Sequence, residues 1–255
     1  MIHTPEELGG KTCSKCKKSA ILEQKYSGRN LCVTHCMADI ESRAKHELRR
    51  HNWLSSHDSI AVGLSGCAVS AAVLAFLHTL TRCRRDITLC AIHLSRESSK
   101  ESDQNRKNAI TVAEQTDVPL IIEPFSLDFL SDQLDLVAKK RGITKVAYGY
   151  HLEDLSSKIL AEVILGDVSS LLYGDDRIDR SHIAPFRIIP QKEALLYAKA
   201  KYPDITWSLT DFKDDAARAL DTYSCKHPSV HHAIIGLCDR IAQTKQHAEF
   251  SRIDR

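Results

Sequence analysis

The feature that most constrains the fold is a regular alternation of apolar runs and helical segments after residue 58. The runs read SIAVGLS, ITLCAIHL, VPLIIEPF and TKVAYGYH, and each is followed by a segment with helical periodicity. Runs that are apolar along their whole length are typical of strands covered on both faces, and intervening helices produce parallel pairing. The sequence therefore predicts an α/β fold with a doubly wound parallel sheet.

The same pattern divides the chain into four expected segments. A cysteine-containing N-terminal piece covers residues 1–40, and a connecting basic helix covers 41–58. The α/β domain covers 59–190 and includes HIAPFRIIP as a further strand candidate. A mostly helical extension covers 191–255, with one short strand expected in DITWSL.

Composition excludes several classes of protein. The 255 residues carry a net charge of only +2, so any nucleic-acid surface has to be a local patch. No apolar run reaches the ~18 residues of a membrane span, and the N-terminus lacks the apolar core of a signal peptide. We therefore expect a cytoplasmic protein with no membrane partner, in which nine cysteines are metal ligands or free thiols.

Four potential metal ligands occur close to the N-terminus. Cys13 and Cys16 form a CxxC pair, and Cys32 and His35 form a CxxH pair fifteen residues later. Two-residue gaps let both pairs converge on one tetrahedral Zn²⁺, and a closed site of this kind is structural. Cys36 is the competing fourth ligand.

The segment MADIESRAKHELRRHNWLSS, which follows, predicts a basic helix. Its cations could contact the phosphates of tRNA, although a solvated helix face is the simpler alternative. The candidate tRNA contacts are Arg43, Lys45, Arg49 and Arg50.

Together these motifs resemble the PP-loop ATPase superfamily, and within it the tRNA 2-thiolation proteins. That family has a CxxC…CxxH knuckle, then a strand–SGGKDS–helix unit, then GHNxDD. Here IAVGLSGCAVS and GYHLED stand at the two later positions. The family segment RIKPLxxxPExExxxYA is matched by HIAPFRIIPQKEALLYA, with Pro185, Pro190, Glu193 and Tyr197 in register.

The resemblance implies nucleotide binding, but the loop departs from the family pattern. Cys67, Ala68 and Val69 stand where the family has glycine, lysine and aspartate. The loop thus lacks a cation for phosphate and a carboxylate for magnesium, and we expect weakened binding of ATP and Mg²⁺. The remaining candidate nucleotide-binding residues are Ser65, Gly66, Cys67, Ser70, Gly149 and Asp154.

This chain also has fewer of the cysteines that carry sulfur in the family. The central region EPFSLDFLSDQLDL has no cysteine, and only Cys225 matches the family's third one. A single thiolate cannot hold an iron–sulfur cluster, so none is expected. Cys225 is the candidate catalytic residue, and with His227, His231 and His232 it could instead form a weak metal site.

Three functions remain open at this point. The first is a degenerate tRNA 2-thiolation protein, a non-catalytic partner of an active thiolase homologue or of a second copy of itself. The second is an active ATP-dependent sulfurtransferase that uses Cys225, or Cys67, with an atypical ATP site. The third is a sensor of nucleotides or anions that does not bind tRNA.

Overall fold

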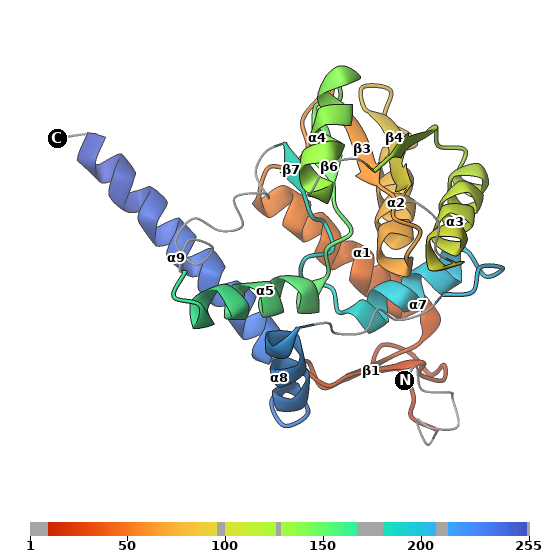
Figure 1. Ribbon diagram of the computed structural model, residues 1–255. Helices are drawn as coiled ribbons and strands as arrows, with labels where there is room; N and C mark the ends of the chain where they lie inside the picture. The colour runs from red at the N-terminus through yellow and green to blue at the C-terminus, as the bar shows by residue number, and fades with distance from the viewer. Residues whose placement is uncertain (1–9, 96–99, 126–128, 168–180, 208–213, 254–255) are drawn as a thin grey trace. The chain divides into compact units, whose positions relative to one another are not determined.

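The computed structural model describes residues 10–95, 100–125, 129–167, 181–207 and 214–253 (Figure 1). The chain divides into two compact units. One unit contains Ile40–His151 and Asp179–Leu209, and the other contains Met1–Asp39, Leu152–Ile178 and Thr210–Arg255. Each unit is described separately below.

A five-stranded parallel sheet forms the centre of the unit that begins at Ile40, and its order is β5-β4-β3-β6-β7. The strands are β3 (Ser59–Gly63), β4 (Thr88–Ser95), β5 (Leu120–Pro124), β6 (Lys145–Ala147) and β7 (His182–Ile183). The predicted doubly wound parallel sheet is therefore confirmed.

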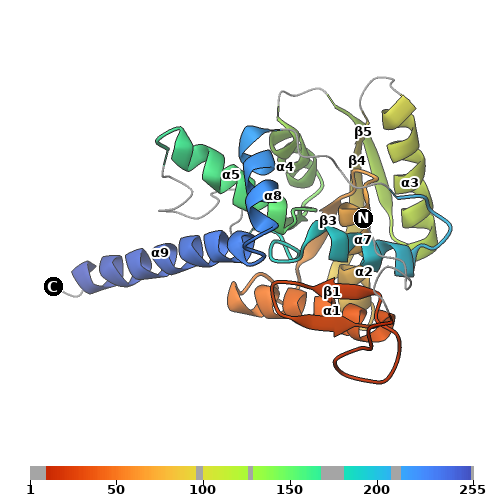
Figure 2. The same ribbon diagram turned by 90° about the horizontal axis from the view of Figure 1, so that it is seen from below.

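Helices between the strands, and one after the last strand, cover the sheet. They are α2 (Ala68–Thr81), α3 (Lys100–Thr116), α4 (Leu130–Lys140) and α7 (Gln191–Lys201). Helix α2 is buried along its whole first ten residues, as expected of a helix that is apolar all round. It lies between the sheet and α7, and Figure 2 shows α2 and α7 side by side.

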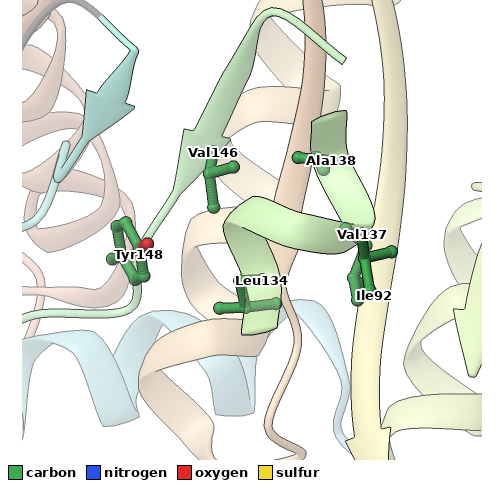
Figure 3. Close-up of a cluster of buried hydrophobic side chains, with 7 residues drawn as sticks. Ile92, Leu134, Val137, Ala138, Val146 and Tyr148 are labelled. Atoms are coloured by element: carbon green, nitrogen blue, oxygen red, sulfur yellow. The ribbon is translucent and has the colours of Figure 1, made fainter. Parts of the chain in front are cut away.

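Helix α4 covers the strands from which the central core is built. Figure 3 shows its Leu134, Val137 and Ala138 pointing toward Ile92 of β4 and Val146 of β6. Burial of each such side chain stabilises the fold by about 1.5–3 kcal/mol. This layer fixes the sheet and thereby the positions of the loops at its edge.

The other unit contains the N-terminal hairpin and three helices. The hairpin pairs β1 (Leu22–Gln24) with β2 (Arg29–Leu31). Helix α1 (Val33–Arg50) begins directly after the hairpin and belongs from Ile40 onward to the sheet-containing unit. Helices α5 (Leu152–Ile164), α8 (Asp215–Ser224) and α9 (Val230–Ile253) pack against one another (Figure 1).

Two strand predictions differ from the structure. HIAPFRIIP forms only the two-residue β7, because Pro185 has no N–H for a ladder and the chain turns from there to Pro190. In DITWSL, residues 204–207 form a turn and irregular backbone, while residues 208–209 lie outside the described residues. Within the described residues, no helix is both long and apolar enough to cross a membrane.

Candidate functional site

The glycine-containing turn between β3 and α2 lies where the strand order reverses. Chain-consecutive strands β3 and β4 are neighbours, but β6 pairs with β3 on its other side. In such sheets, ligands bind outside the carboxyl ends of the strands at this reversal. A Cβ added to Gly149, after β6, would lie 3.0 Å from the Cα of Ser70, so the two predicted loops meet here.

Gly66 is the tightest point of the turn. Its φ of +88° is in the left-handed region, and an added Cβ would lie 1.9 Å from the Asn105 carbonyl oxygen in α3. No substituent fits there, because Asn105 is in the hydrogen-bonded body of a helix. The turn is therefore fixed against α3 by backbone-to-backbone contact.

Replacing Gly66 with alanine should lower the free energy of unfolding by about 2–5 kcal/mol, the sum of left-handed strain and overpacking. Gly142→Ala is the matched control, because Gly142 has a φ of +67° and nothing within 4 Å of the added Cβ. Only the conformational cost of about 1–2 kcal/mol remains at that position. Urea unfolding would measure both, and equal losses would contradict the role given to Asn105.

Hydroxyl and thiol groups inside the turn bond to one another. Ser65 Oγ donates to Cys67 Sγ at 3.1 Å and lies 3.1 Å from Ser70 Oγ. Ser70 Oγ also donates to the Cys67 carbonyl at 3.0 Å. Cys67 occupies the N-cap of α2 without a side-chain bond to the helix N–H groups. The three polar side chains left in the loop thus have internal partners.

Ala68 and Val69 contribute no charge to this site. Both side chains belong to the first turn of α2 and are buried, with exposures of 5% and 3%. The two positions that carry lysine and aspartate in the resembled motif therefore add apolar packing here.

Two buried polar side chains that the sequence did not single out hold the turn in place. His93, at the end of β4, donates from Nδ1 to the Leu64 carbonyl at 2.8 Å. Asn108 of α3 donates from Nδ2 to the Gly66 carbonyl at 3.3 Å. In the sequence, His93 could have been recognised as a histidine within an otherwise apolar strand. The sequence around Asn108 gave no signal for its role, because polar residues are common on helices.

Asp154 belongs to the other compact unit. It is exposed in the first turn of α5, where a carboxylate stabilises the helix N-terminus. Its assignment to nucleotide binding stays a prediction.

The four N-terminal ligands converge as their spacing indicates. The ligand atoms of Cys13, Cys16, Cys32 and His35 all lie within 4.8 Å of one another. The Sγ atoms of Cys16 and Cys32 are 3.7 Å apart, and His35 Nδ1 is 3.4 Å from the sulfurs of Cys13 and Cys32. Tetrahedral zinc, with Zn–S bonds of about 2.3 Å, separates its ligands by about 3.7 Å. The donor set therefore fits zinc.

The chemistry around Cys13 also suits a metal ligand. Burial acts to raise the pKa of its thiol, but backbone N–H groups of Cys32 and Lys15 outweigh this effect and lower the pKa to about 6. Thiolates are the form that binds zinc. Cys36 is fully buried and is not among the four clustered ligands.

The predicted tRNA contacts on α1 differ in their surroundings. Arg43 forms an ion pair with the buried Glu193 and keeps only 18% of its side chain exposed. Lys45 pairs with Glu41 at 3.5 Å, and Arg50 lies 3.9 Å from Glu47. Arg49 is exposed and has no ion-pair partner in the described residues. Contact of these four with tRNA stays a prediction.

Cys225 is exposed at the C-cap of α8, where its thiol lies 3.5 Å from the Asp221 carbonyl. The alternative of a second metal site with the nearby histidines is wrong for the described residues, whose one ligand cluster is the N-terminal one. His231 is buried and lies 2.6 Å from Ser156 Oγ, while His232 packs against the ring of Tyr26.

Comparison with known proteins agrees with this geometry. Residues 12–35 match a family model described as the N-terminal LIM domain of the 2-thiouridine synthetase TtuA. The tRNA 2-thiolation protein NcsA of Haloferax volcanii is 22% identical over 91% of this chain and 87% of that protein. Cytoplasmic tRNA 2-thiolation protein 1 of Drosophila ananassae is 25% identical over 74% of this chain, which spans 64% of that protein.

A solved structure shows the same fold. The U34-tRNA thiolase NcsA from Methanococcus maripaludis, solved with its 4Fe–4S cluster, superposes with a TM-score of 0.78. The match covers 91% of this chain and 87% of that one at 21% identity.

Proposed function

Because the chain belongs to the tRNA 2-thiolation protein family of the PP-loop superfamily, we propose that it is a non-catalytic member of that family. It retains the α/β fold and the structural zinc knuckle, and it acts as a partner of an active thiolase or of a second copy. It retains affinity for tRNA.

One observation carries this proposal. The turn between β3 and α2 presents a thiol and two buried apolar side chains at consecutive positions 67–69. Adenylation needs a cation to neutralise the phosphates and a carboxylate to place Mg²⁺. The backbone turn and helix N-terminus alone offer only weak attraction for an anion.

The decisive measurement is isothermal titration of the full chain with ATP and Mg²⁺. We expect no binding tighter than about 1 mM, which corresponds to about −4 kcal/mol. Omitting Mg²⁺ should change nothing, because the loop has no carboxylate to hold it. Tight, magnesium-dependent binding by the wild-type protein would overturn the proposal in favour of an active enzyme.

A matched variant sharpens the titration. Cys67→Gly combined with Ala68→Lys and Val69→Asp restores the resembled loop, and Cys67→Gly alone is its control. We expect the triple variant to gain magnesium-dependent affinity and the single variant to remain weak. Circular dichroism would verify that both variants are folded.

A further inference from the structure

A groove lies where helices α1 and α2 end, next to the turn that leads into β4. Its volume is about 430 Å³, within the range of about 300–1,000 Å³ found for ligand pockets. Its lining residues all belong to the sheet-containing unit: Lys45, Leu48, Arg49, Asn52, Leu54, Leu80, Thr81 and Arg84.

The groove combines an apolar floor with positive charge. Leu48 is buried, while Leu54 and Leu80 are half-buried. The cations Lys45 and Arg49 come from the last turns of α1, and Arg84 comes from the turn after α2. A surface of this kind matches a ligand that has both apolar groups and negative charges.

The groove and the turn after α2 carry more basic residues than the neighbouring acidic residues pair with. Lys45 pairs with Glu41, and Arg84 pairs with Asp86 at 2.5 Å. Arg49, together with Arg82 and Arg85 on the turn that carries Arg84, is exposed and has no acidic partner in the described part of the chain. Basic residues near helix C-termini are common because they offset the helix dipole. Arg49, which lines the groove without an acidic partner among the described residues, exceeds that need.

We propose that this groove binds an acidic amphipathic helix of a partner protein. Apolar side chains of such a helix, one turn apart, would contact the leucines, and its carboxylates would pair with the arginines. Single-stranded RNA is held by stacking its bases on aromatic rings, and none of the eight lining residues is aromatic. The lining therefore favours a peptide over single-stranded RNA.

This inference deepens the proposed function, since a non-catalytic family member acts through its partners. Arg43, which the sequence grouped with the groove cations, takes no part because Glu193 already binds it.

The test uses the full-length protein and defined probes. The first is a fluorescein-labelled helical peptide of about four turns, with leucines on one face and glutamates on the other. The second has serine in place of leucine, and the third has lysine in place of glutamate. An RNA hairpin of anticodon stem-loop size is the fourth. Fluorescence anisotropy at two salt concentrations measures binding.

We expect the leucine–glutamate peptide to bind with a Kd on the order of 10–100 µM and the other peptides much more weakly. Arg49→Glu should weaken binding by about tenfold or more, because it reverses an unpaired charge in the groove. Leu80→Ser should weaken it by about threefold to tenfold. Arg106→Glu, which reverses an exposed charge on α3, is the matched control and should change binding less than about twofold.

Three results would overturn the proposal. These are absence of peptide binding at low salt, equal binding of the leucine and serine peptides, and Arg49-dependent binding of the hairpin but not of the peptide. Melting temperatures of the variants would show that they are folded. None of these results depends on ATP, so the titration above judges the proposed function separately.

Discussion

Replacing Cys32 with serine should remove zinc from the protein and unfold the N-terminal knuckle. Cys32 supplies one of four clustered ligand atoms, and its sulfur contacts both Cys16 Sγ and His35 Nδ1. Structural zinc contributes about 10–16 kcal/mol of apparent folding free energy in zinc-finger peptides, so partial compensation by the short β1–β2 hairpin is not expected. Elemental analysis gives the metal content, and hydrogen exchange over residues 10–35 reports the loss of structure.

Two cysteine variants separate ligand loss from general thiol loss. Cys83 is exposed and outside the cluster, so Cys83→Ser should keep one zinc ion per chain. Cys36→Ala should also keep zinc, although it loses stability because Cys36 is fully buried. A Cys32→Ser protein with full zinc content would contradict the ligand assignment.

Elemental analysis of the wild-type protein should find only trace iron. Iron at cluster stoichiometry would contradict the expected absence of an iron–sulfur cluster.

Glu47→Ala should lower the free energy of unfolding by about 3–5 kcal/mol. Glu47 is 2% exposed and lies 3.2 Å from Arg187 Nη1 and 3.5 Å from His51 Nε2. This contact joins α1 to the segment after β7, which the sequence places 140 residues away. Removing the carboxylate leaves the buried guanidinium without that ion pair.

The controls for Glu47 use an exposed pair and a double variant. Glu123 and Arg141 form an exposed pair at 3.3 Å, and Glu123→Ala should cost less than about 1 kcal/mol. Replacing Glu47 by leucine and Arg187 by methionine together should be less harmful than Glu47→Ala, because no buried charge remains. Chemical denaturation would rank the three variants. A loss no larger than that of Glu123→Ala would contradict the structural role of Glu47.

The Glu47 effect should also depend on pH. Burial alone would raise the pKa of its carboxyl, but the hydrogen bond to His51 and the charges of Arg187, His51 and Arg50 outweigh burial and lower it. A lowered pKa stabilises the folded state above the unfolded glutamate pKa of about 4.3. That stability is lost as pH falls through the folded value, so wild type and Glu47→Gln should converge in strongly acidic solution.

Local features of the molecule were predictable because their causes are local. Strand and helix positions follow from the periodicity of neighbouring residues, and two-residue gaps place Cys13, Cys16, Cys32 and His35 around one centre. The loop at residues 64–70 was located in the same way, since a parallel sheet places such turns at the carboxyl ends of its strands. The strand predicted in HIAPFRIIP is shorter than expected because Pro185 ends the ladder.

The roles of the charged residues on α1 could not be predicted from the sequence. Arg43 and Arg49 look alike in ESRAKHELRR, yet one pairs with Glu193 and the other lines a groove. The difference arises from residues that approach α1 only when the chain folds. The same holds for His93 and Asn108, whose partners are carbonyl groups of the distant turn.

The sequence by itself determined the parallel α/β architecture, the ligands of the metal knuckle, and the exchange of glycine, lysine and aspartate for Cys67, Ala68 and Val69. These depend on residue type and on spacing along the chain. Only the tertiary structure decided that Asn105 closes on Gly66, that Glu47 holds Arg187, and that Arg49 and Arg84 flank one groove. Such contacts join residues far apart in the chain, and packing of whole helices against the sheet is what brings them together.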